Sequence, residues 1–87
     1  MHAVLIDVTI NDTPAAQAEL SELVPRVSAA PGFVAGYWMA LSQDKGSAVV
    51  VFDSEASAQA LATQVAATPA GPVTTDSVEV GEVIAHA

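Results

Sequence analysis

The sequence has no cysteine and very few basic residues. Its 87 residues include ten Asp and Glu but only two Lys and Arg, namely Arg26 and Lys45, which gives a formal net charge of −8. Without cysteine there is no disulfide, no thiolate metal site and no cysteine nucleophile. Because binding to phosphate groups relies on Lys and Arg, nucleic acid and anionic membrane surfaces are poor candidates for partners.

Long apolar runs and targeting signals are also missing. The longest apolar stretch, from Phe33 to Leu41, is less than half of the roughly 20 residues that a membrane-spanning helix needs. The first residues do not combine a basic segment with an apolar core, as a signal peptide does. We therefore expect a cytoplasmic protein with no membrane partner.

Hydrophobic residues, by contrast, are abundant, at 52 % of the chain against 14 % charged residues. The length predicts one domain over residues 1–87, and a domain of this size buries only about two-thirds of its unfolded surface. This composition indicates more apolar surface than one small core can hide. A partner chain is the expected cover for the remainder.

The first half of the chain reads as a strand, a helix and a strand. Residues 2–11 alternate strictly between two sets of side chains, which predicts a strand. Thr13 and Pro14 suit the cap and first position of a helix. Pro25 interrupts the helical spacing, so we expect it to kink the helix or split it near Val24. The segment 33–41 follows as a strand that is apolar on both faces, with Phe33 and Tyr37 in one phase and Trp38 in the other.

The second half repeats the pattern. A turn at 43–46 leads to a strand over 47–52, and Asp53 and Ser54 are alternative caps of a helix that ends near Ala67. The expected inner face of this helix is apolar and consists of Ala58, Leu61, Ala62, Val65 and Ala66. The last strand covers 74–86, where Gly81 indicates a bulge or a close backbone approach.

This order is that of the ferredoxin-like βαββαβ fold, an α+β class in which two helices cover one face of a four-stranded antiparallel sheet. The other face would be bare and apolar. Packing of that face against a second copy, under two-fold symmetry, is the simplest way to cover it. We therefore predict a homodimer that forms through the sheet faces.

The first and last strands are antiparallel neighbours in this fold, and their phases predict a register. The predicted pairs are Val4 with Ile84, Val8 with Val80, and His2 with His86. Two His residues without a third ligand make a poor metal site, so no metal site is predicted. No His lies within reach of Ser42, Ser47, Ser54 or Ser57, which excludes a hydrolase triad.

Three segments give the chain a resemblance to a known family. They are the first strand, the Pro31-Gly32-Phe33 entry to the second strand, and the junction from Val49 to Ala56. With these the chain resembles the antibiotic-biosynthesis-monooxygenase-like proteins of the dimeric α/β-barrel superfamily. The resemblance implies a homodimer with an apolar pocket between each sheet and its own helices. Members include cofactor-free oxygenases of polycyclic phenols, heme-degrading enzymes and proteins without an established activity.

The sequence departs from the heme-degrading members at three places. Phe52 stands where the junction aromatic residue is usually Trp, and Asp7 stands where those members carry Asn on the first strand. Their His on the second helix is replaced by the apolar segment Ala60-Leu61-Ala62. Heme is therefore not expected, and no other cofactor is predicted.

Asp7 is the candidate catalytic residue. A carboxylate set among apolar neighbours such as Leu5 is desolvated, which makes it a stronger proton acceptor, as a general base toward a phenol requires. The alternative is an acid at the rim of the sheet that stays hydrated or accepts a hydrogen bond from a neighbour.

The candidate ligand-binding residues are Trp38, Tyr37, Phe52 and Leu61. Trp38 and Tyr37 project to opposite faces, and either could stack on an aromatic ligand and donate one hydrogen bond. The alternative for these side chains is packing in the core or at an interface.

Three functions follow. The first is a homodimeric protein that binds a small molecule, with an aromatic ligand as the candidate. The second is a cofactor-independent monooxygenase of phenolic substrates with Asp7 as base. The third is a purely structural dimer.

Overall fold

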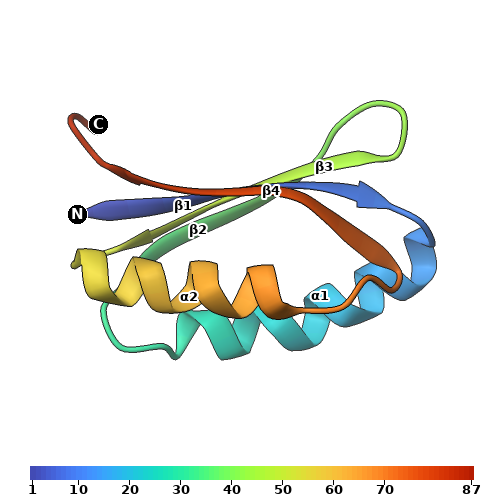
Figure 1. Ribbon diagram of the computed structural model, residues 1–87, viewed down its shortest axis with the longest axis horizontal. Coiled ribbons are helices and arrows are strands. Elements are labelled where there is room, and N and C mark those ends of the chain that lie inside the picture. The colour runs from blue at the N-terminus through green and yellow to red at the C-terminus, as the bar shows by residue number, and fades with distance from the viewer.

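The computed structural model covers residues 1–87 and contains the six elements in the predicted order. They are β1 (His2–Ile10), α1 (Thr13–Ser28), β2 (Phe33–Ala40), β3 (Lys45–Phe52), α2 (Glu55–Ala67) and β4 (Val73–Glu82). The strands form one antiparallel sheet in the order β2-β3-β1-β4. Both helices lie against the same face of this sheet (Figure 1). The predicted ferredoxin-like fold is thus confirmed.

Polar side chains fix the start of each helix. The Asp12 carboxylate accepts a hydrogen bond from the Ala15 amide at 3.1 Å, so Asp12 is the cap of α1 and Thr13, the predicted cap, is its first residue. Ser54 caps α2 by accepting a bond from the Ser57 amide at 3.3 Å. Neither helix is long and apolar enough to cross a membrane.

The predicted split of α1 at Pro25 is wrong. The helix continues through Pro25 to Ser28, and the Pro25 carbonyl still accepts a bond from the Ala29 amide. Pro25 lies only one turn before the end of the helix. A proline removes a single backbone donor there, and too little helix follows for the break to separate two pieces.

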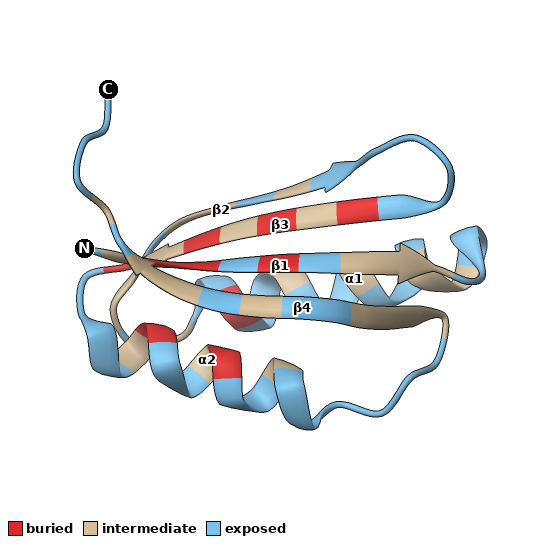
Figure 2. Cartoon of the chain, turned by 45° about the horizontal axis from the view of Figure 1, so that its top comes forward, coloured by how far each residue is buried: buried red, intermediate tan, exposed pale blue.

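The hydrophobic core lies between the sheet and the helices (Figure 2). Its fully buried centre consists of Phe52, Val4 and Val50, from β3 and β1. Val27 completes it from α1, and Ala58 and Ala62 from α2. Because the buried side chains of α2 are small, this helix lies close to the sheet. The predicted inner face of α2 holds except for Ala66, which is exposed.

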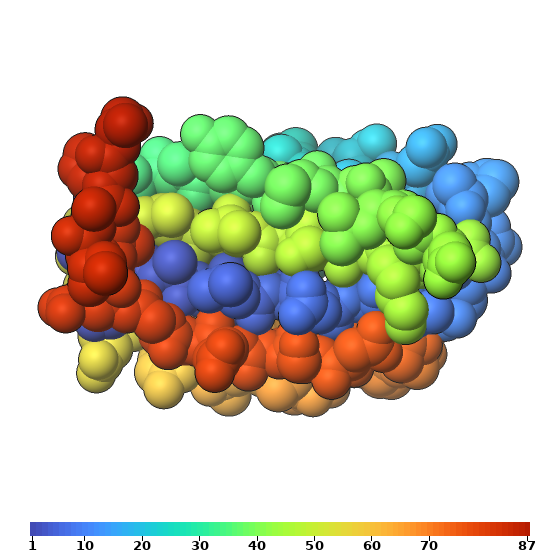
Figure 3. All heavy atoms as spheres, turned by 90° about the horizontal axis from the view of Figure 1, so that it is seen from above, coloured from blue at the N-terminus to red at the C-terminus, as the bar shows by residue number.

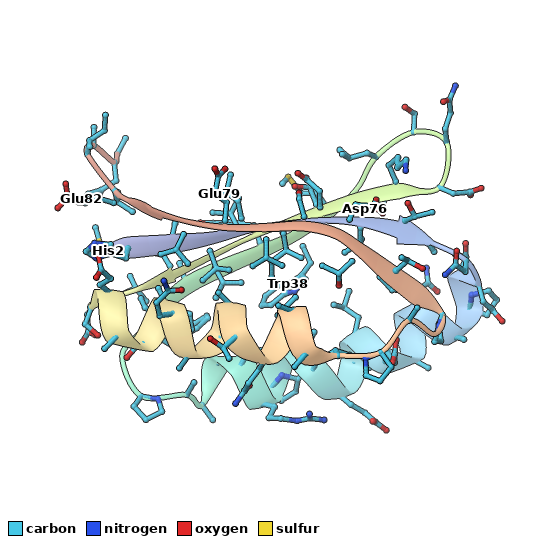
Figure 4. All side chains as sticks on the ribbon, in the orientation of Figure 1. His2, Trp38, Asp76, Glu79 and Glu82 are labelled. Carbon is cyan, nitrogen blue, oxygen red and sulfur yellow. The ribbon has the colours of Figure 1, made fainter.

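The strand β2 changes phase near its start. The pairing of β2 with β3 shifts between Phe33 and Ala35, as in a β-bulge. Phe33 therefore turns toward the helices, where its ring meets that of Phe52 edge to face at 6.2 Å between centroids. Trp38 also lies between the sheet and the helices (Figure 4), while Tyr37 faces away from them. The prediction that Phe33 and Tyr37 share a face is wrong because strict alternation overlooks this bulge.

The register between β1 and β4 differs from the predicted one. The two strands are antiparallel neighbours as expected, but Val4 pairs with Val80 and His2 with Glu82. Ile84 lies beyond β4 and is 92 % exposed, so it cannot pair with Val4. Over residues 2–7 the observed register differs from the predicted one by four residues, and an even slip keeps each side chain on the same face, so the apolar pattern alone could not distinguish the two registers. Beyond Asp7, Val8 pairs with Thr75, so the predicted pair of Val8 with Val80 is also wrong.

The irregularity in this ladder also lies elsewhere than predicted. The register shifts between Asp7 and Val8, opposite Asp76, and not at Gly81. No atom comes within 4 Å of a Cβ built at Gly81, so this glycine marks no close approach. The ladder is held at its far end by Asn11, whose side-chain amide donates to the Gly71 carbonyl at 2.9 Å and to Thr74 at 2.8 Å. His86 is outside the sheet, so the predicted pair of His2 and His86 does not form.

We expect Gly36→Ala to destabilise the fold, because a Cβ at position 36 would lie 2.7 Å from the ring of Trp38. Overpacking of this kind costs about 1–3 kcal/mol. Urea unfolding followed by tryptophan fluorescence measures the loss. The control is Gly71→Ala, where nothing lies within 4 Å of the added Cβ. Equal free energies of unfolding for the two variants would contradict this placement of Trp38.

Candidate functional site

A groove of about 480 Å³ runs between α1 and α2. Eight of its 13 lining residues are hydrophobic, and Phe52 is the one that comes from the sheet. From α1 and the segment after it come Leu23, Arg26, Val27, Ala30 and Pro31; from α2 and its C-terminal cap come Ala56, Ser57, Ala60, Leu61, Gln64, Val65 and Thr68.

The groove exists because the two helices pack on different parts of the sheet. The main contacts of α1 are with β2, at one edge, whereas α2 packs against β4, β1 and β3. The backbones of the two helices approach each other closely at hardly any point, although Val27 of α1 shares the core with Ala58 and Ala62 of α2. Ala30, Ala56 and Ala60 on the facing sides are too short to close the space between them.

The charge of the groove differs from that of the protein as a whole. No Asp or Glu lines it, and its only charged residue is Arg26. Our sequence analysis did not identify Arg26 as a site residue. The sequence did contain a signal that Arg26 shares a helix face with apolar residues. The spacing of a single helix face is found in Leu23, Arg26, Val27 and Ala30.

The opposite, helix-free face of the sheet carries a row of polar side chains across three strands. Asp7 on β1 pairs with Ser47 on β3 and Ser77 on β4. The Ser47 hydroxyl donates to one oxygen of the Asp7 carboxylate at 3.1 Å, and the Ser77 hydroxyl donates to the other at 3.0 Å. Asp7 is exposed, so the expectation of a buried carboxylate is wrong. Its apolar neighbour Leu5 is itself exposed on this face, because no helix covers it.

A second polar group continues this row toward the end of the sheet. Lys45 donates to the Thr9 hydroxyl at 2.7 Å, and Thr9 donates to the Asp76 carboxylate at 2.7 Å. Lys45 is also 3.5 Å from Asp76. Lys45, one of the two basic side chains of the protein, is thus paired with a carboxylate of its own chain.

Large apolar side chains lie beside these polar groups on the helix-free face. Tyr37 is 64 % exposed, Met39 46 % and Leu5 44 %. Glu79 projects from the same face (Figure 4). The C-terminal segment crosses one end of this face from β4 toward β2 (Figure 3).

The structure divides the predicted ligand-binding residues among three places. Phe52 and Leu61 line the groove together. Trp38 is on the helix side of the sheet but packs against the core and does not line the groove. Tyr37 lies on the helix-free face, as does Asp7, so neither side chain reaches the groove.

The groove offers no axial ligand for a heme iron. Its lining includes no His, Met or Tyr, and hence no side chain that could coordinate a heme iron. No group of three His, Asp or Glu side chains anywhere in the chain is arranged to hold a metal ion. His2 instead pairs with Glu55, the first residue of α2, at 3.4 Å.

The ferredoxin-like fold of this chain is shared with a protein of known structure. The chain is similar to a crystal structure of a MhuD mutant with two manganese protoporphyrin IX molecules bound per active site. The TM-score is 0.72 at 14 % sequence identity, and the match covers 100 % of this chain and 98 % of that one. No family model matches the sequence, and no curated protein matches it. The likeness therefore establishes the fold, and the residues of the site have to be interpreted on their own.

We expect Asp7→Asn to lower the free energy of unfolding of the single chain by less than about 1 kcal/mol, because the side chain is exposed in it and an amide can still bond both serines. Urea unfolding at a fixed protein concentration measures the change. The control is Ile6→Asn on the same strand, which places an amide in the core and should cost several-fold more. A comparable loss in both variants would mean that Asp7 is buried.

Proposed function

We propose that this protein binds a small, largely apolar molecule in the groove between α1 and α2. The observation that carries this proposal is an open space of about 480 Å³ with eight hydrophobic lining residues, where two helices would otherwise pack together. Ligand sites in proteins are typically apolar clefts of about 300–1,000 Å³ with a few polar groups. Ser57, Gln64 and Arg26 supply such polar groups here.

The similar protein gives this proposal further support. MhuD has the same fold and binds manganese protoporphyrin IX in its active site. A porphyrin itself is not the ligand that we propose for this chain, because no side chain in the groove can coordinate its metal.

The groove also separates this function from its two alternatives. A purely structural dimer needs no open space lined by apolar side chains. A monooxygenase with Asp7 as general base requires the substrate to contact that carboxylate, but Asp7 and the groove lie on opposite faces of the sheet. Binding is therefore the function that the geometry favours.

We expect Ala60→Trp to abolish binding of N-phenyl-1-naphthylamine, a neutral aromatic probe whose fluorescence rises in apolar sites. Ala60 is exposed and lines the groove, so an indole at this position fills the space without entering the core. The matched control is Ala67→Trp, an exposed position on the same helix that does not line the groove. Its affinity should remain within about two-fold of wild type. If the wild-type protein does not bind the probe, or if both variants bind it equally, the groove is not the site.

We further propose that a second copy of this chain covers the helix-free face of the sheet. Its exposed apolar side chains, Leu5, Tyr37 and Met39, lie beside a bonded polar row, a mixture typical of protein interfaces. The molecule measures 33 × 23 × 22 Å along its principal axes, so its largest face is comparable with the roughly 800 Å² per partner of a standard interface. The resemblance of the sequence to the dimeric α/β-barrel superfamily also implies such an association.

We expect Val49→Glu to yield a folded monomer. Val49 lies on the helix-free face between Leu5 and Tyr37, so a charge there opposes burial against a partner but leaves the core intact. Sedimentation of wild type at micromolar concentration should show two chains. The control is Thr63→Glu, an exposed position on α2, which should remain dimeric. A wild-type protein that stays monomeric at millimolar concentration would rule out this interface.

A further inference from the structure

The distribution of charge around the groove is the starting point. Ten of the 87 residues are Asp or Glu, yet none of the 13 residues that line the groove is acidic. In a protein with a formal net charge of −8, the side chains that line this groove therefore do not repel a negative group, and one of them, Arg26, attracts it.

Arg26 is also free to bind a ligand. It forms no ion pair and no side-chain hydrogen bond within the chain, whereas the other cation of this kind, Lys45, is engaged by Thr9 and Asp76. A guanidinium carries five N–H donors in a planar arrangement that matches the two oxygens of a carboxylate or sulfonate. Arg26 lies in the last turn of α1, where a cation also interacts favourably with the helix terminus. That interaction leaves its donors unoccupied.

We infer that the ligand of the groove is an amphipathic anion, whose acidic group is bound by Arg26 while its apolar body lies against Phe52, Leu61 and Val65. This inference deepens the proposed function and depends on it. Gln64 lines the same groove from α2 and provides a neutral amide donor for a second oxygen of the acidic group. Removing Arg26 should weaken binding of an anion and leave binding of a neutral molecule of the same shape unchanged.

Two related probes separate these effects. 1-Anilinonaphthalene-8-sulfonate has the ring system of N-phenyl-1-naphthylamine and adds one sulfonate group. For Arg26→Gln we expect the dissociation constant of the sulfonate probe to rise by about ten-fold, as for the loss of a charge-assisted bond of roughly 1.4 kcal/mol. The constant of the neutral probe should change by less than about two-fold. Gln and Arg have similar helix propensities, so α1 should be preserved, which circular dichroism checks.

The control for overall charge is Lys45→Gln, which changes the net charge by the same amount outside the groove. It should shift the affinity for the sulfonate probe by less than about two-fold. If Arg26→Gln and Lys45→Gln weaken the sulfonate probe equally, or if Arg26→Gln affects both probes alike, the inference is wrong although the groove still binds ligands. If Ala60→Trp leaves the binding of both probes unchanged, the proposed binding function itself fails.

Discussion

The edge-to-face contact between Phe52 and Phe33 is the interaction on which most of this structure depends. Phe52 pairs with Phe33 on β2 and with His2 on β1, so three strands meet at this ring. It is 1 % exposed, and it closes the core at the point where β3 ends and α2 begins. The same side chain is the sheet's contribution to the groove. Core packing and ligand binding therefore share one aromatic residue, and a change there cannot affect one without the other.

The groove and the bare sheet face follow from the way in which helical cover is distributed. Two helices cover one side of the sheet, and α2 can lie close to it because the side chains of Ala58 and Ala62 are short. The distance between α1 and α2 then leaves a space that no side chain of the chain fills. On the other side, a carboxylate bonded by two serines lies among exposed apolar side chains. The two surfaces differ in chemistry, which is why we assign ligand binding to one and association to the other.

The sequence predicted the element order and the sheet because strand alternation and helical spacing are local properties. It also predicted that Trp38 and Tyr37 face opposite sides, and it selected Phe52 and Leu61, which meet in the groove. It could not identify which face of β1 the helices cover, so Asp7 was expected to be buried. The pairing of Val4 with Val80 could not be predicted either, because a slip of four residues along β4 leaves the alternation of apolar side chains unchanged. Arg26 was not identified because its significance comes from the groove that it lines, whose other lining residues come from elements distant in the sequence.

The two helices are held against the sheet to different extents, and this has a mechanical consequence. The main contacts of α1 are with the edge strand β2, and Val27 is its one buried residue, whereas α2 packs against three strands. The width of the groove can therefore change more easily by a movement of α1 over the edge of the sheet than by a movement of α2. Amide protons exchange with solvent when the structure opens locally, and the free energy of this opening should be lower in α1 than in α2, whose Ala58 and Ala62 are held in the core. The groove can therefore adapt its width to the size of a ligand, because α2 is held firmly against the sheet and α1 can move.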